Sequence, residues 1–268
     1  MKMKKIILLL ISVIGLSISV QAADAKSDRL FQVALLQSLM RGEYDGVITV
    51  WELKHYGDTG IGTFQGVNGE LIALNGKVYR AAWDGSVEIA PDDETVPFSN
   101  VTFFDDDIVV ENVKCNSIDE LKSIFDSIVN RHGKNQFYMV KLSGIFSKML
   151  VRSELPQHEP YRPLAEALKT DQREFTYEDI NGTVVALYCP DYMEGLNSSG
   201  WHLHFVSDDE TKGGHVLGLE VANATLAMDI ISEFSMIVPN RASFNGKDLA
   251  ADMKEEIREV EQDTVEMK

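Results

Sequence analysis

The sequence predicts an α+β protein, mostly antiparallel sheet with few helices. Short apolar runs separated by Gly-containing turns predict strands, and the Asn-Gly pairs at residues 68–69 and 75–76 are typical of tight hairpins. Helix signals are fewer. Two segments, residues 49–52 and 117–120, begin with Thr or Ser followed three positions later by Glu, which is the capping-box pattern of a helix N-terminus.

The first half of the chain alternates these signals in order. Residues 30–39 are apolar enough for a first buried strand or helix, and the first capping box opens a short helix that ends near His55. The second box opens a helix whose apolar residues recur at helical spacing until Gly133. Between the two helices, strands are expected at residues 62–64, 70–74, 77–82, 101–104 and 108–113.

The second half is richer in strands. Strands at residues 137–142 and 148–152 are expected to form a hairpin around Ser143 and Gly144. Residues 156–163 resemble a linker, and a short helix follows. This helix is expected at residues 164–169. Strands are expected at 183–188 and 224–234, with two histidine-bearing strands between them. A final helix at 248–261 is expected to turn Leu249, Met253, Ile257 and Val260 inward.

Residues 1–22 have the organisation of a cleaved signal peptide. Three lysines precede a run of about fifteen apolar residues, and Val20 and Ala22 are small residues at the positions that signal peptidase reads. A transmembrane anchor is the alternative, but such a run is short for a bilayer. We therefore expect export to the periplasm or the outside of the cell, with cleavage after Ala22 and no membrane association afterwards.

The chain is strongly acidic. Its formal net charge of −17 becomes −20 once the three lysines of residues 1–22 are lost. Such a surface repels nucleic acid and anionic lipid, and basic runs are absent, so both are excluded as partners. An anionic substrate would therefore need local positive charge at its site.

Cys115 and Cys189 are the only cysteines. In an exported protein they are able to pair, but a separation of 74 positions says nothing about their geometry. A disulfide and two buried free thiols both remain open.

Three of the six histidines fall within fourteen residues. On a strand, His202 and His204 share one face, and the Gly-rich turn before His215 brings a returning strand alongside them. Three neutral imidazoles that converge leave a fourth tetrahedral position for water or substrate, which is typical of a catalytic zinc site. His55, His132 and His158 match no such pattern and are expected to be ordinary surface or loop residues.

The motifs around these histidines resemble those of α-acetolactate decarboxylases. The similar segments are residues 201–205 and 213–217, residues 60–64 with 68–70, and residues 160–164, in the same order from about residue 30 to residue 262. The resemblance implies two sheet-based subdomains, an N-terminal one at residues 26–155 and a C-terminal metal-binding one at residues 156–268, with the pocket between them.

The resemblance also implies a function. The chain is expected to be a Zn²⁺-dependent carboxy-lyase that converts 2-acetolactate, a small 2-hydroxy-3-keto acid, to acetoin and carbon dioxide. His202, His204 and His215 would bind the zinc, and Arg152 would orient the substrate carboxylate with its planar guanidinium.

The same resemblance implies the acid–base groups. Glu70 and Glu261 would manage protons, with Thr63 lining the pocket. Glu256 also flanks the apolar stripe of the last helix, so the choice between it and Glu261 stays open at this point.

Two other functions fit the histidine pattern. A cupin-like metal oxygenase usually adds a carboxylate ligand, and an exported, non-catalytic metal-binding protein has no use for an arginine clamp. The oligomeric state is not fixed by the sequence, and a homodimer is one option.

Overall fold

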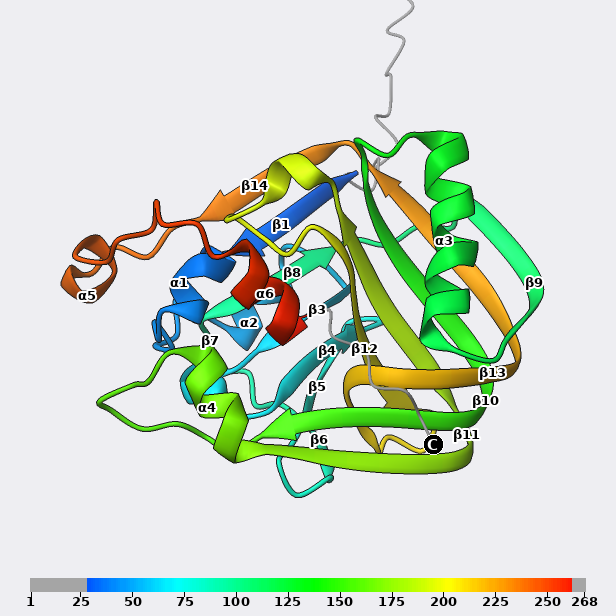
Figure 1. Cartoon of the computed structure of the whole chain (residues 1–268), viewed down its shortest axis with the longest axis horizontal. Coiled ribbons are helices and arrows are strands. Elements are labelled where there is room, and N and C mark those ends of the chain that lie inside the picture. Colours follow the sequence, from blue (N-terminus) through cyan, green and yellow to red (C-terminus); the bar gives the residue numbers. More distant parts are fainter. Residues whose placement is uncertain (1–27, 262–268) are drawn as a thin grey trace, which may run out of the picture.

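The computed structural model describes residues 28–261 (Figure 1). The expected signal peptide lies outside the described residues. Two sheets of mostly antiparallel strands dominate the architecture, as the sequence predicts. In the described part of the chain, no helix combines the length and apolar character that a membrane crossing requires.

The first sheet has seven strands in the order β14-β1-β8-β3-β4-β5-β6. Only the pairing of β1 with β14 is parallel; the others are antiparallel. The strands are β1 (Arg29–Val33), β3 (Thr59–Thr63), β4 (Glu70–Leu74), β5 (Lys77–Ala81), β6 (Val87–Ile89), β8 (Phe98–Thr102) and β14 (Glu233–Ile237).

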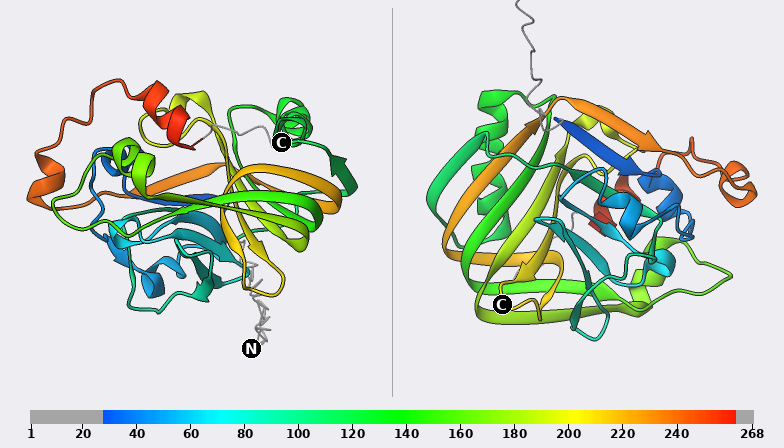
Figure 2. Two further views of the ribbon diagram at one scale, coloured as in Figure 1. Left: turned by 60° about the horizontal axis from the view of Figure 1, so that its bottom comes forward. Right: turned by 180° about the vertical axis from the view of Figure 1, so that it is seen from behind.

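The second sheet contains the longest strands of the described chain. Its order is β10-β11-β12-β13-β9, and β10 also pairs with β13, which closes the first four strands into a ring. The curvature of these strands is visible in Figures 1 and 2. They are β9 (Ile108–Cys115), β10 (Phe137–Glu154), β11 (Gln172–Cys189), β12 (Gly200–Ser207) and β13 (Gly213–Ile231); β2 (Ile48–Thr49) and β7 (Thr95–Val96) form a separate pair.

Both predicted capping boxes begin helices. At the start of α2, Thr49 and Glu52 form both hydrogen bonds of a capping box. At the start of α3, the Ser117 side chain accepts a hydrogen bond from the Glu120 amide at 3.1 Å, and this helix ends before Gly133. The described helices are α1 (Leu36–Met40), α2 (Val50–Leu53), α3 (Ile118–His132), α4 (Leu164–Asp171), α5 (Ala242–Asn245) and α6 (Lys254–Glu261), with short 3₁₀ turns η1 (Gln65–Val67) and η2 (Asp191–Met193).

The hairpin expected around Ser143 and Gly144 was wrong, because β10 runs straight through both residues. Gly144 pairs with Gly182 on one side and Ala224 on the other. A Cβ atom built at Gly144 would lie only 2.3 Å from the Asn223 carbonyl oxygen. The glycine therefore permits a close approach of strands rather than a turn.

The two faces of β12 meet different parts of the protein. Leu203 and Phe205 belong to a core shared with α3, which lies on the face of the second sheet that is turned away from the first sheet (Figure 2). His202 and His204 alternate with them and therefore face the opposite side. There the Nδ1–H of His204 donates to the carbonyl oxygen of Leu71, on β4 of the first sheet, at 2.9 Å. The histidine face is thus the face between the sheets.

The change of sheet does not fall at residues 155–156. β9 and β10 precede that point but belong to the second sheet, and β14 returns to the first sheet near the end of the chain. The subdomain division there stays a prediction. Of the two states left open for the cysteines, the structure has the free thiols: Cys115 and Cys189 are both buried and form no disulfide.

A candidate metal and acid–base site between the sheets

The three predicted histidines converge on one point. His204 and His215 are directly paired across β12 and β13, and His202 lies two residues earlier on β12. The Nε2 atom of His202 lies 2.9 Å from Nε2 of His204 and 3.1 Å from Nδ1 of His215. Two nitrogens of a tetrahedral zinc site are separated by about 3.3 Å for bonds of roughly 2.0–2.1 Å. The spacing therefore fits three ligands of one metal ion.

The electrostatic surroundings keep these imidazoles in the neutral form that binds a metal. All three are buried, and burial is the largest cause that lowers their pKa values. The nearby charge of Arg152 adds to the effect, and the pKa of His202 falls to about 3. The bond from His204 Nδ1–H to Leu71 fixes the tautomer that turns its Nε2 lone pair toward the other two rings.

The first sheet contributes Glu70 and Thr63. Glu70 begins β4 directly after the Asn68–Gly69 turn, and its Oε2 lies 3.3 Å from Nε2 of His204. The Thr63 hydroxyl, on the neighbouring strand, donates to the Gly69 carbonyl at 2.9 Å. Thr63 lines the pocket and also fixes the backbone that aims Glu70 at the histidines.

Helix α6 contributes Glu261. Its Oε2 lies 3.2 Å from Nε2 of His202. Met253, Ile257 and Val260 are buried against a core that includes α1 and α4, which seats the helix over the site. Glu256 is exposed on the same helix. Of the two candidates left open by the sequence, the structure brings Glu261 into the pocket.

The expected helix at residues 248–261 is shorter than predicted and begins at Lys254. The carboxylate of Asp252 accepts a hydrogen bond from the Lys254 amide at 3.1 Å, which is an Asx turn just before the helix. Asp248 makes a similar local bond to the Ala250 amide. These side-chain bonds replace helical ones before residue 254.

Arg152 lies at the end of β10 with only 5% of its surface exposed. One terminal nitrogen donates to the Val260 carbonyl at 2.6 Å, and the other to Gln172 at 3.1 Å. The Nε atom is buried and has no hydrogen-bond partner. An unpaired buried donor on a cation is costly, so this edge of the guanidinium is suited to an anionic ligand.

Glu154 is a site residue that the sequence reading missed. It follows Arg152 by two positions on β10, lines the same pocket and forms a hydrogen bond with Glu70. Burial raises its pKa to about 7, against the opposing charge of Arg152. Side chains two positions apart on a strand share one face, as His202 and His204 do. Because Arg152 was expected in the pocket, the same alternation could have predicted that Glu154 lies there too.

Glu70 and Glu261 are also shifted toward the protonated form. Burial is the largest cause for both; it raises the pKa of Glu261 to about 7 and that of Glu70 well above its usual value. The charge of Glu154 raises the pKa of Glu70 further, while Arg152 lowers both. The site therefore holds carboxyl groups that can carry protons near neutral pH.

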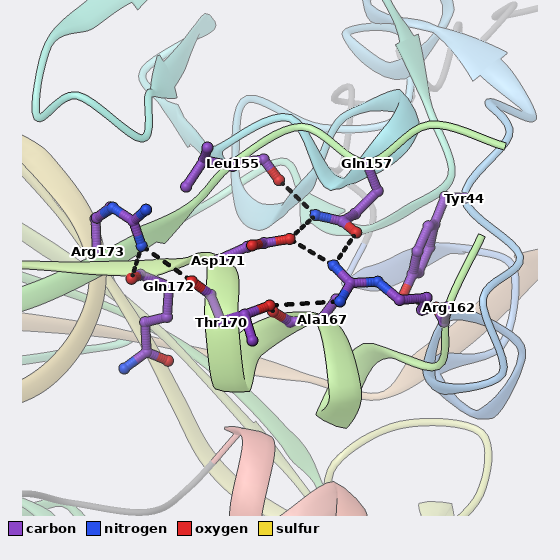
Figure 3. A network of polar contacts seen from close by, with 9 residues as sticks. All are labelled: Tyr44, Leu155, Gln157, Arg162, Ala167, Thr170, Asp171, Gln172 and Arg173. Carbon is purple, nitrogen blue, oxygen red and sulfur yellow. Dashed lines mark hydrogen bonds and ion pairs between the residues drawn. The ribbon is translucent and has the colours of Figure 1, made fainter. Parts of the chain in front are cut away.

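One wall of the pocket is apolar. Leu39, Val67, Phe98, Leu164 and Leu168 line it opposite the polar groups. Its α4 portion is anchored by the polar network in Figure 3, in which Arg162 contacts both Asp171 and Gln157. Tyr44 donates to the Arg162 carbonyl at 2.8 Å. The linker-like segment before α4 is thus tied in place.

The three other histidines lie apart from this cluster. His55 and His132 are exposed, and His158 is exposed in the segment before α4. Among the described residues, the ligand atoms of His202, His204 and His215 form one of two groups whose spacing would suit a metal ion. The donor set, its neutral charge state and its spacing all fit a divalent metal.

Comparison with known proteins gives a consistent result. Residues 30–251 match the family model described as alpha-acetolactate decarboxylase. A protein of that name from Methanosarcina mazei is 39% identical over 235 residues, 88% of this chain and 81% of its own. One from Methylococcus capsulatus is 38% identical, covering 87% and 88%. The crystal structure of the Bacillus subtilis alpha-acetolactate decarboxylase aligns with a TM-score of 0.83 at 32% identity, over 87% of this chain and 99% of that one.

Proposed function

The chain belongs to the α-acetolactate decarboxylase family of carboxy-lyases, and we propose that it converts 2-acetolactate to acetoin and carbon dioxide with the help of a zinc ion. The residues that would hold the zinc are His202, His204 and His215. Zinc suits the site because three neutral imidazoles are a common ligand set of catalytic zinc, and neither cysteine lies in the cluster to close the fourth position. When bound, the ion supplies a Lewis acid that polarises the ketone oxygen of the substrate.

Arg152 orients the carboxylate that leaves. Its unpaired Nε–H and the remaining hydrogens on its terminal nitrogens offer a fork to two carboxylate oxygens. The bonds to Val260 and Gln172 hold the guanidinium in place before the substrate arrives, so less rotamer entropy is lost on binding.

The reaction needs one proton. Loss of carbon dioxide breaks the bond between the carboxylate carbon and C2, and the electron pair becomes conjugated with the neighbouring ketone as an enediolate. Glu70 and Glu261 each lie within about 3.3 Å of a histidine nitrogen, and a proton from one of them to C2 completes acetoin. Glu154 contacts Glu70 and is positioned to hold or return a proton.

The remaining walls match the rest of the substrate. The apolar residues of the pocket suit the two methyl groups of acetolactate. Outside, Arg152 also borders an open hollow lined by Lys169 and Arg173. With Arg152 these cations outnumber the two glutamates of the same hollow, Glu174 and Glu259, which leaves the local positive charge that an anionic substrate needs near so acidic a protein.

The observation that carries this proposal is the burial of Arg152 in the same pocket as the histidine cluster. A metal-binding protein without catalysis has no need for a buried cation with a free donor. The cupin-like oxygenase loses its support because the chain matches the decarboxylase family over residues 30–251.

The direct test is to incubate the purified protein with racemic 2-acetolactate and to measure acetoin and carbon dioxide. Activity should disappear after metal removal and return with one zinc per chain, and manganese and cobalt should be compared in parallel. An absence of acetoin from the zinc-loaded protein would refute the decarboxylase activity. Full activity in the metal-free protein would refute only the metal dependence.

We also propose that the protein is exported with cleavage after Ala22, on the basis of the lysine-rich and apolar organisation of residues 1–22. Mass spectrometry of the protein from its native cell should find Ala23 at the N-terminus. Recovery of the intact Met1 form from the cytoplasm would contradict export.

A further inference from the structure

Three aspartates gather far from the histidines in the fold, where the chain crosses between the sheets. Asp105 and Asp107 lie in the connection from β8, in the first sheet, to β9, in the second. Asp229 lies near the end of β13, just before the chain returns to the first sheet as β14. One carboxylate oxygen from each of the three lies within 4.8 Å of the others.

Asp229 has the surroundings of an unfilled ligand. Only 1% of its surface is exposed, and neither of its carboxylate oxygens has a hydrogen-bond partner of ordinary geometry. Its pKa is raised to about 8, mainly by burial and also by the negative charges of Asp105 and Asp107, against a smaller lowering effect of the Asp105 amide. A buried, unpaired carboxylate among other carboxylates is unfavourable unless a cation compensates it.

One of the other two aspartates is already held in position. Asp107 accepts a hydrogen bond from the Ile230 amide through Oδ2 at 2.9 Å, which fixes it beside Asp229. Asp107 is exposed and Asp105 is half-buried. The cluster is therefore closed on the Asp229 side and open to water on the other, so that water can complete a coordination shell.

We propose that Asp105, Asp107 and Asp229 form a second cation site, separate from the histidines, that takes a hard divalent cation of the calcium type. All the donors are carboxylate oxygens, which calcium and magnesium prefer and which zinc prefers less than nitrogen or sulfur. Calcium is favoured over magnesium because it accepts six to eight oxygens in irregular arrangements, whereas magnesium demands a near-ideal octahedron.

The position indicates what the cation does. It joins the β8–β9 connection to the end of β13, and those are two places where the chain passes from one sheet to the other. The start of β1 also lies here, since the Asp28 carbonyl accepts from the Glu233 amide at 2.8 Å. The charge of Asp28 acts on Asp229 as well. A bound cation would stabilise the contact between the sheets rather than take part in the reaction.

The test uses the full chain with zinc loaded at the histidines, stripped of other cations. Equilibrium dialysis with calcium chloride should show one further ion per chain, with affinity in the micromolar to millimolar range. Calcium at about 100-fold above its dissociation constant should raise the melting temperature by roughly 5–10 °C. Magnesium chloride should bind at least about 10-fold more weakly.

Variants distinguish this site from weak binding to the acidic surface. Asp229→Asn and Asp105→Asn should each weaken calcium binding at least about 10-fold and abolish the thermal shift. Asp106→Asn is the matched control, because Asp106 is exposed between the two connection ligands; it should behave as the unmodified protein. Calcium binding that is undetectable at millimolar concentration, or equal in Asp229→Asn and Asp106→Asn, would overturn the proposal. If Asp229→Asn does not fold, calcium binding by Asp105→Asn and Asp107→Asn tests the site instead, and unchanged binding in both would overturn the proposal.

Discussion

Arg152 and His215 occupy paired positions on adjacent strands, β10 and β13. The cation proposed to hold the leaving carboxylate and a proposed metal ligand are therefore separated by one strand spacing, set by backbone hydrogen bonds rather than by flexible loops. Such a relationship is difficult to disturb without disturbing the sheet, so substitutions of the side chains test the chemistry without moving the backbone.

The first prediction concerns the metal. His204→Ala should reduce bound zinc from about one per chain to near zero and acetoin formation by at least about 100-fold, because a ligand and its tie to Leu71 are both lost. Elemental analysis with parallel activity measurement checks it. His132→Ala, on an exposed histidine, should change neither quantity. Full zinc occupancy in the His204 variant would remove this residue from the ligand set.

The second prediction concerns Glu261. Glu261→Gln keeps volume and hydrogen-bonding reach but cannot supply a proton, so turnover should fall on the order of 10²-fold while zinc is retained. Glu70→Gln should behave in the same way. Glu259→Gln, exposed on the same helix, is the control and should be active. Near-normal turnover in both the Glu70 and Glu261 variants would show that neither is the acid.

The third prediction concerns Arg152. Arg152→Lys keeps the charge but loses the fork and the bonds to Val260 and Gln172. We expect kcat/KM for acetolactate to fall roughly 10- to 100-fold. Steady-state kinetics should be compared with Arg173→Lys, an exposed site outside the pocket where the same exchange should be almost silent. Equal effects at both positions would exclude a specific role for Arg152.

The fourth prediction is a pH effect from Glu154. Its charge raises the pKa of Glu70, so Glu154→Gln should lower that pKa. If protonated Glu70 is the acid, activity is lost as the pH rises through its pKa, and the alkaline limb of the kcat profile should move to lower pH in the variant. Glu174→Gln, exposed on β11, should leave the profile unchanged. An unmoved limb in Glu154→Gln would separate Glu154 from the acid–base chemistry.

The fifth prediction is a pH dependence of stability in calcium-free protein. Folding raises the pKa of Asp229 from 3.8 to about 8, so the folded chain keeps a proton that the unfolded chain has released. This group makes its whole contribution to the free energy of unfolding below about pH 4, and the contribution is lost as the pH rises to about 8. Asp229→Asn removes this loss, so its stability relative to the unmodified protein should increase between about pH 5 and about pH 8 in urea unfolding. A constant difference would contradict the shift.

The sequence predicted local features better than distant ones. The capping boxes at Thr49 and Ser117 depend on contacts three residues apart, and both begin helices. The pairing of His204 with His215 followed from strand alternation and a short turn. Gly144 was read as a turn because a glycine signals either a turn or a close approach, and only the neighbouring strands, far away in the sequence, distinguish the two.

The missing parts of the site were those set by tertiary contacts. No local pattern reveals that Leu71 accepts from His204, or that α6 folds back to place Glu261 beside His202. Glu154 has an acidic side chain at the end of a strand, which is usually solvated. Its burial depends on Glu70, more than eighty positions earlier in the chain, and on α6 at its far end.

The dependence of the site on α6 has a genetic consequence. Both sheets are complete by Ile237, so a stop codon shortly after it would leave every strand of residues 28–261 encoded. The shortened product would lack Glu261, the Val260 carbonyl that holds Arg152 and the apolar residues that cover the pocket. Late nonsense and frameshift alleles of this gene should therefore behave as nulls for the decarboxylase while still producing protein that antibodies detect.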